Sequence, residues 1–225
     1  MSSDNFFNFP VELMRVAPDM KRFCNNVMDY AVYAHSLKLE GQDAMKDAAK
    51  YFGITLGNIL QSKRNGSDLY NKIALPAPMT GISKDLIFKF YRDYKTEHET
   101  AVLIAFLAIK SILGKKSYCR ITNEYLLCRM AGYRSKKDMP ELPAWLKRYQ
   151  GRRGMNAIKL DLQRFYGLKL YARFTRGFFV SFSLSLEELI REVEKKRKQY
   201  YETTLQGETS AAVSKVLNQL YNGKN

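Results

Sequence analysis

A segment in the second half of the sequence carries side chains that suit the reading of DNA bases. Apolar residues recur there every three or four positions, which predicts an amphipathic helix over Arg152–Tyr166. The inward face of this helix would hold Met155, Ile158, Leu162 and Phe165. Its opposite face and flanks would hold Arg152, Arg153, Asn156, Lys159, Gln163 and Arg164. Arginine can hold a guanine edge through two hydrogen bonds, and asparagine or glutamine can hold adenine in the same way, so the segment is a candidate major-groove reader.

Two other residues of this helix widen its interpretation. Leu160 also faces outward, which fits either contact with a thymine methyl group or an interface with another domain. Asp161, on one flank, is the single acidic residue of the segment. An ordinary amphipathic surface helix is the structural alternative to a recognition helix.

A β-hairpin is predicted directly after the helix, over residues 169–175 and 178–184. Polarity alternates with a period of two, so that Lys169 and Arg173 share one face of the first strand, and Arg176-Gly177 forms a tight turn. The returning strand would bury Phe178, Val180, Phe182 and Leu184. Three cations, Lys169, Arg173 and Arg176, could then contact backbone phosphates or the minor groove. A hairpin that only covers the core would explain the apolar face but not these cations.

The segment before the basic helix has the pattern of the first helix of a helix-turn-helix. Thr122 can cap a short helix whose Leu126, Leu127 and Met130 point inward, and Gly132 can end it tightly. The run Cys119-Arg120-Ile121-Thr122-Asn123, followed by Gly132-Tyr133-Arg134-Ser135, resembles the winged-helix domains of plasmid replication initiators and phage replisome-organising proteins. The resemblance covers residues 98–184 and implies a winged helix that binds DNA, with Arg134 added to the candidate DNA-binding residues.

The sequence departs from that family pattern in one place. In the family the recognition helix usually begins directly after the serine, whereas here residues 136–150, with Pro140 and Pro143, come first. The departure leaves open which helix of this chain is the recognition helix.

A second candidate helix-turn-helix lies in residues 43–64. Ala49, Gly53 and Thr55 have the spacing of a small residue at the helix crossing followed by a glycine turn, and Ile59 would pack inward. Gly57 would weaken the second helix, and this part of the chain is almost neutral. A purely structural role and a DNA-contacting role both remain open for it.

The placement of charge supports a polyanionic partner. Of the net +15, residues 1–83 contribute nine basic and eight acidic side chains, and residues 84–225 contribute 28 and 14. Residues 141–176 alone hold nine basic side chains against Glu141 and Asp161. Such a field attracts phosphates and releases their condensed counterions, although a solvated basic surface has the same composition.

The remaining pattern predicts a mostly α protein with a small antiparallel β-hairpin. Helices are expected over residues 11–39 in two pieces, 42–66 in two pieces, 83–94, 97–113, 122–131, 143–150, 152–166 and 186–201. The prolines and glycine of residues 75–81 predict a linker. We therefore expect a helical domain over residues 1–78, a winged-helix domain over 79–205 and a C-terminal tail over 206–225.

Chemistry other than binding has little support in the sequence. Cys24, Cys119 and Cys128 form no Cys-x-x-Cys pair, and neither His35 nor His98 neighbours a cysteine, so no disulfide framework, metal site or cofactor is expected. Residues 114–117 match only the end of a phosphate-binding loop, and the carboxylates do not form pairs. The chain is expected to be non-catalytic.

The sequence thus predicts a cytoplasmic, sequence-specific protein that binds double-stranded DNA, and the family resemblance implies a role in replication initiation or transcriptional control of a mobile element. No signal peptide or membrane span is expected, and a homodimer is an alternative to a monomer. Two other functions stay open: a winged helix that contacts only proteins, and a nuclease or nicking enzyme.

Overall fold

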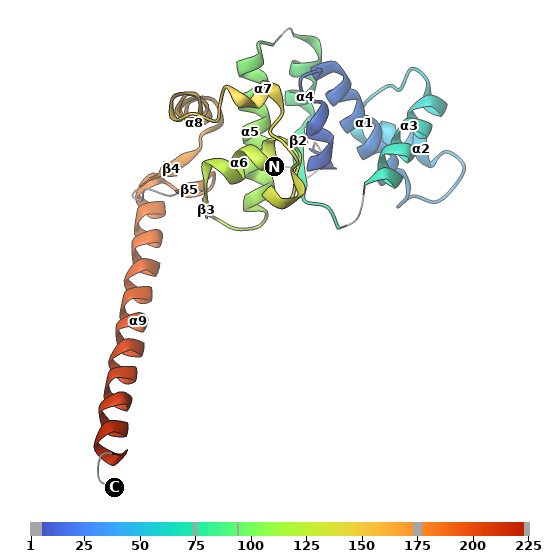
Figure 1. Cartoon of the computed structure of the whole chain (residues 1–225). Coiled ribbons are helices and arrows are strands. Elements are labelled where there is room, and N and C mark those ends of the chain that lie inside the picture. The colour runs from blue at the N-terminus through green and yellow to red at the C-terminus, as the bar shows by residue number, and fades with distance from the viewer. Residues whose placement is uncertain (1–5, 74–75, 94, 173–176, 223–225) are drawn as a thin grey trace.

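The computed structural model describes residues 6–73, 76–93, 95–172 and 177–222, and its fold is mostly helical with two small antiparallel sheets. Figure 1 shows a body from which one long helix projects. Within the described ranges, none of the helices combines the length and the hydrophobicity that crossing a bilayer requires.

Three helices pack together near the start of the chain. They are preceded by a strand and a 3-10 helix, and the five elements are β1 (Phe6–Pro10), η2 (Val11–Val16), α1 (Met20–Ser36), α2 (Ala44–Phe52) and α3 (Ile59–Lys72). The Asp19 carboxylate caps α1 by accepting a hydrogen bond from the Arg22 amide at 3.0 Å. Gly53 ends α2 in the left-handed conformation, with φ of 60°. The start of α1 and the end of α2 therefore lie where local signals place them, whereas residues 11–16 form a 3-10 helix and α3 ends at Lys72 instead of residue 66.

The first sheet joins the two halves of the chain. β1 pairs antiparallel with β2 (Met79–Ser83), so residues 79–81, which the sequence assigns to a linker, form a strand instead. The Thr80 hydroxyl donates to the Leu107 carbonyl at 2.8 Å, and Lys110 Nζ donates to the Gly81 carbonyl at 2.7 Å. These bonds fix the sheet to the helix that contains Leu107 and Lys110.

That helix, α5 (Glu97–Leu113), is the centre of the fold. It follows α4 (Lys84–Arg92), whose first turn is capped by the Ser83 hydroxyl, as the sequence predicts. A capping box between Thr96 and Glu99 starts α5, and most of its residues from Thr100 to Ile109 are buried. A helix that is apolar on nearly all sides must be covered by several neighbours, and α5 is packed by β2, α6 and α8.

The second sheet lies after α5. In chain order the elements are β3 (Cys119–Ile121), α6 (Asn123–Met130), η3 (Lys136–Asp138), α7 (Ala144–Lys147), α8 (Arg152–Tyr166), β4 (Lys169–Tyr171) and β5 (Phe178–Ser181). The sheet is antiparallel with the order β3-β5-β4, so β3 adds a third strand that sequence analysis did not predict. α8 has the predicted bounds, and Gly167 ends it with φ of 66°.

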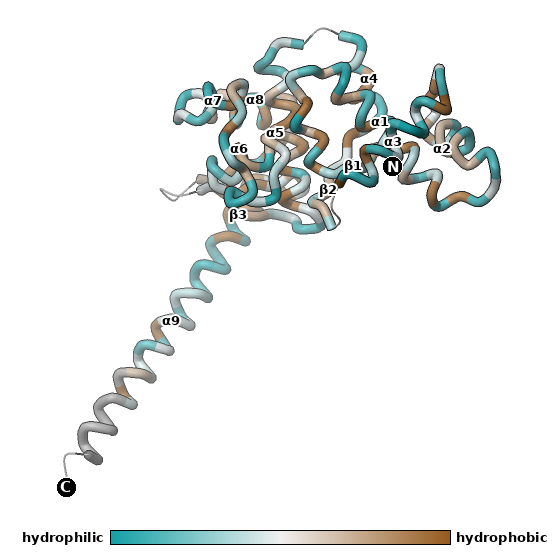
Figure 2. Tube along the Cα trace, turned by 45° about the vertical axis from the view of Figure 1, so that its right-hand side comes forward, coloured by the Kyte–Doolittle hydropathy of each residue, from teal (hydrophilic) through white to brown (hydrophobic). Residues whose placement is uncertain are grey.

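The last helix is longer than predicted. α9 (Leu186–Asn222) runs without a break through residues 206–222, so the predicted tail continues the same helix. Its first turns pack on β4 and β5 through Leu189 and Val193, and Figure 2 shows the helix leaving the body, with mostly hydrophilic residues in its coloured turns.

One cluster of buried residues runs through the body. It extends from Phe7 and Phe9 in β1 to Phe178 and Val180 in β5. The predicted border at residue 78 therefore lies inside continuous packing, and the division into two domains stays a prediction.

Candidate nucleic-acid interface

The basic helix α8 is held to the body by its apolar face. Met155, Ile158 and Leu162 are each 0% exposed, as the sequence predicts, and α8 packs mainly on α5. Phe165 was predicted to lie inside as well, and this is wrong, because its side chain is 64% exposed. The apolar stripe of α8 reaches one turn further than the surface that covers it.

The opposite face of α8 is open to solvent. The predicted base-reading and flanking residues that are exposed are Arg152, Arg153, Asn156, Gln163 and Arg164. Within the described residues, none of the three arginines forms an ion pair, and the Arg164 guanidinium only lies 5.2 Å from the Phe165 ring centroid. Gln163 donates a long hydrogen bond of 3.3 Å to the Lys159 carbonyl of its own helix. The polar groups of this face are therefore available to a ligand.

The acidic residues of the basic segment do not neutralise that face. Glu141 pairs with Lys147 at 2.6 Å, and Asp161 Oδ2 lies 2.8 Å from His98 Nε2. Arg148 pairs with Glu97 of α5 at 2.8 Å. Both carboxylates of residues 141–176 are thus paired with side chains other than the arginines of α8.

Lys159 has a different position from the other candidates on α8. Its ammonium lies 3.8 Å from the centroid of the Phe178 ring on β5, and burial lowers the pKa of this amine. The side chain is half-buried, so it joins α8 to the sheet rather than extending freely into solvent.

The structure describes the predicted wing in part. Lys169, at the start of β4, is exposed, and Phe178 and Val180 of β5 are buried as predicted. The predicted phosphate contacts Arg173 and Arg176 lie outside the described residues.

A buried arginine organises the turn after α6. Arg129 is 4% exposed, and its guanidinium donates to the Ser111 hydroxyl at 2.8 Å, the Tyr125 hydroxyl at 2.7 Å and the Arg134 carbonyl at 3.3 Å. Sequence analysis missed it, although Tyr125 one turn earlier offered a partner. Arg134 itself is exposed and lines a small cavity with Glu12 and Arg15, and no residue of α8 lines that cavity.

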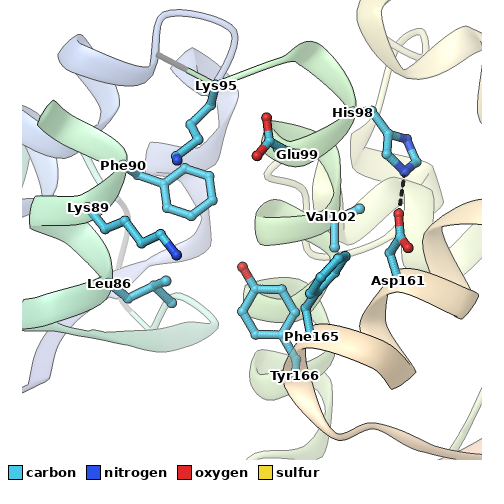
Figure 3. Close-up of a pocket in the computed structure, with 10 residues that line it drawn as sticks. All are labelled: Leu86, Lys89, Phe90, Lys95, His98, Glu99, Val102, Asp161, Phe165 and Tyr166. Atoms are coloured by element: carbon cyan, nitrogen blue, oxygen red, sulfur yellow. Dashed lines mark hydrogen bonds and ion pairs between the residues drawn. The ribbon is translucent and has the colours of Figure 1, made fainter. Parts of the chain in front are cut away.

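A pocket lies behind the C-terminal half of α8, between this helix, α4 and α5 (Figure 3). Its volume is about 300 Å³, and Phe165, Tyr166, Lys89 and Lys95 point into it. Burial raises the pKa of the Tyr166 phenol to about 12, with the nearby carboxylate of Glu99 adding to the shift. The pocket explains why Phe165 is exposed on the inward side of its helix.

The back of α8 is tied to α5 at the edge of this pocket. Asp161 and His98 meet there, and His98 Nδ1 lies 3.3 Å from the Tyr149 hydroxyl (Figure 3 shows the first contact). Sequence analysis named both residues without joining them, because 63 positions separate them. The lone acidic residue on a basic helix was the one available signal.

The second candidate helix-turn-helix forms two helices, but its second helix begins later than the motif requires. Ala49 is buried and Gly53 has positive φ, whereas α3 starts only at Ile59. Gly66 of α3 lies so close to α1 that a Cβ atom would be 2.5 Å from the Asp29 carbonyl oxygen. α3 is thus packed tightly on α1 along one side.

In the part of the chain that the structure describes, no three His, Cys, Asp or Glu side chains gather as metal ligands. No protein-family profile matches the sequence, no curated protein resembles it significantly, and no solved structure matches it significantly.

Proposed function

We propose that this protein binds double-stranded DNA in a sequence-specific manner, with α8 in the major groove and the β4–β5 hairpin as a wing. The observation that carries the proposal is the outward face of α8, which presents three arginines, Asn156 and Gln163 to solvent with both nearby carboxylates occupied elsewhere. Arginine, asparagine and glutamine are the side chains that form paired hydrogen bonds with purine edges.

The winged-helix interpretation is supported by the order of the elements. α5, β3, α6, α8, β4 and β5 follow one another as helix, strand, helix, helix, strand, strand, and the strands form one antiparallel sheet with β5 in the centre. This order agrees with the one that the winged-helix prediction requires, if η3 and the short α7 are taken as an insertion before the recognition helix. The insertion corresponds to the departure from the family pattern seen in residues 136–150.

The mechanism that we propose separates affinity from specificity. Lys169 and the arginines near the start of α8 would hold phosphates, which gives affinity that depends on salt. Asn156, Gln163 and the arginines that reach the groove would discriminate bases. The resemblance to plasmid initiators and phage replisome organisers suggests a role at a replication origin or at an operator of a mobile element.

Selection of bound fragments from a random duplex pool, followed by fluorescence anisotropy on the selected site, tests the proposal. We expect an enriched motif and an affinity that falls on the order of tenfold or more between low and physiological salt. Asn156→Ala should relax the preference at one base position and weaken binding to the selected site roughly fivefold to a hundredfold. No enrichment together with no salt dependence would contradict it.

A surface that contacts protein is a second candidate, because Leu160 in the middle of the outward face is 65% exposed. Protein interfaces are enriched in arginine and bury apolar side chains, so an exposed leucine among arginines also fits such a surface. Leu160→Ala separates the two functions: it should change DNA affinity no more than about threefold if α8 reads DNA, and it should abolish capture of a protein partner if α8 is a protein interface.

A further inference from the structure

A cavity of about 480 Å³ lies among the helices of the first half of the chain, away from α8. Its walls come from α1, the turn between α2 and α3, the start of α3, and α4. The turn is that of the second candidate helix-turn-helix, so Gly53 and Thr55 line a cavity. The DNA-binding function proposed above gives this cavity no role.

The cavity contains a carboxylate without a counter-ion. Asp29 on α1 is 8% exposed, and its carboxylate accepts a hydrogen bond from the Asn65 amide at 3.2 Å. This partner is neutral, as is the nearby Ser62 hydroxyl, and within the described residues no lysine, arginine or histidine pairs with Asp29. Burial raises the pKa of this carboxyl group above its usual range. A buried charge without an opposite charge is costly, which favours a cationic ligand beside it.

The other walls suit an organic cation. Asn25 and Ser62 bring side-chain oxygen atoms to the same cavity, and Phe88 and Tyr91 of α4 supply aromatic surface. Aromatic faces attract ammonium groups and cover apolar carbon atoms. The Lys84 ammonium lies close to Gly53, but Lys84 is not one of the residues that line the cavity.

We propose that this cavity binds a small organic ammonium ligand, whose charged nitrogen pairs with Asp29 and whose apolar part packs on Phe88 and Tyr91. The ligand would contact α1 and α3 on one side and α4 on the other. It would therefore stabilise the packing of the first three helices against the rest of the body. The site does not depend on the proposed DNA binding.

Three probes that share the 2-phenylethyl group and differ in charge test the charge preference: 2-phenylethylamine, 2-phenylethanol and 3-phenylpropionate. Isothermal calorimetry and thermal denaturation on the full chain measure binding of each. We expect saturable heat and a rise of Tm with the amine alone, because a ligand that binds only the folded state stabilises it. Equal responses to the three probes, or no saturation with the amine, putrescine or agmatine up to roughly 10 mM, would overturn the proposal.

Asp29→Asn removes the charge and keeps an oxygen that can accept from Asn65. It should weaken the binding of 2-phenylethylamine on the order of tenfold to a hundredfold, as expected for the loss of a charged hydrogen-bond partner. Asp47→Asn, on the exposed side of α2, is the matched control and should leave binding unchanged. Binding that survives Asp29→Asn would also refute the site, whatever the outcome of the DNA experiments.

Discussion

α8 and α3 are both second helices of candidate helix-turn-helix segments, and they differ less in composition than in the contacts of their polar side chains. α3 carries Lys63, Arg64 and Lys72 against Asp68, so it too is basic. Both helices also contain a glutamine and at least one asparagine that could read adenine. Composition alone does not distinguish them.

The amide side chains make the distinction. On α3, Asn65 donates to the buried Asp29 of α1 at 3.2 Å, and Gln61 of the same helix donates to Asn65 at 2.8 Å, so Asn65 holds the helix to α1 and Gln61 orients it. On α8, Asn156 has no hydrogen bond within the described residues, and the tether to the body, Asp161 with His98, lies on the other side of the helix. A helix whose polar groups are already bonded loses those bonds when it binds a base, and this cost favours α8 as the reading helix.

The largest effect is expected from removing the cations of each helix in turn. Arg152→Ala, Arg153→Ala and Arg164→Ala combined should weaken DNA binding roughly a hundredfold or more at physiological salt and reduce the salt slope by about 2–3. The reason is that each arginine lost from the interface leaves one fewer phosphate or base contact. Anisotropy titrations over a range of salt concentrations measure both quantities.

The matched control is the combination Lys63→Ala, Arg64→Ala and Lys72→Ala on α3, which removes the same charge. We expect it to change affinity less than about threefold, through the general field alone. Equal losses from the two triple variants would mean that net charge, and not the surface of α8, determines binding.

The next effect concerns two glycines at tight helix contacts. A Cβ atom at Gly154 of α8 would lie 2.5 Å from the Arg148 carbonyl oxygen, and one at Gly66 of α3 would lie 2.6 Å from Tyr33 Cβ. Gly154→Ala and Gly66→Ala should each destabilise the fold by about 1–3 kcal/mol, partly offset by the better helix propensity of alanine. Thermal denaturation should show this as a loss of roughly 2–4 °C per kcal/mol.

Only Gly154→Ala should also weaken DNA binding, because it displaces the start of α8 from α7. Gly57→Ala, where no atom lies within 4 Å of the added carbon, serves as the control and should be close to neutral. A DNA-binding defect in Gly66→Ala measured well below its Tm would place α3 in the interface after all.

Local signals predicted the helices that carry these glycines, whereas the strands that sequence analysis missed depend on long-range pairing. The bounds of α8, the cap of α6 at Thr122 and the left-handed Gly167 follow from periodicity and capping within a few residues. β1 and β2 pair across about 70 positions, and β3 has three residues, so neither sheet contact leaves a readable local pattern. α9 continues past Tyr201 because no proline follows, and the single Gly207 inside it costs only about 1 kcal/mol of helix propensity.

The candidate site was predictable to the same extent. Exposure of Arg153, Asn156 and Arg164 follows from helical periodicity once Met155, Ile158 and Leu162 face the core. The half-burial of Lys159 on Phe178 and the exposure of Phe165 depend on neighbouring elements. Periodicity gives the direction of a side chain but not the extent of the surface that covers it.

A smaller effect is expected from the tether behind α8. A double-mutant cycle with His98→Ala and Asp161→Ala should give a coupling free energy of roughly 0.5–1 kcal/mol, because both side chains are partly solvated and form one short contact. The exposed pair of Lys136 and Glu124 provides a control cycle, which should be near zero. Urea denaturation measures both coupling free energies. Equal values would mean that the contact between His98 and Asp161 contributes no more than an exposed ion pair to holding α8 on the body.

The smallest effect is expected at the contact between Asn65 of α3 and Asp29 of α1, measured without ligand. Because burial raises the pKa of Asp29 in the folded state, the unfolded chain ionises more easily, and the wild-type protein loses stability as pH rises from about 4 through the folded pKa. Asp29→Asn keeps a hydrogen-bond acceptor and has no charge to bury, so its stability relative to wild type should rise over that pH interval and then stay constant. Thermal denaturation from acidic to neutral pH measures the difference, with Asp47→Asn as the control for net charge. If the stability of Asp29→Asn relative to wild type instead falls as pH rises, the ionised carboxylate is better stabilised in the α1–α3 contact than in water. A carboxylate would then hold α3 to α1, as Asp161 holds α8 to α5.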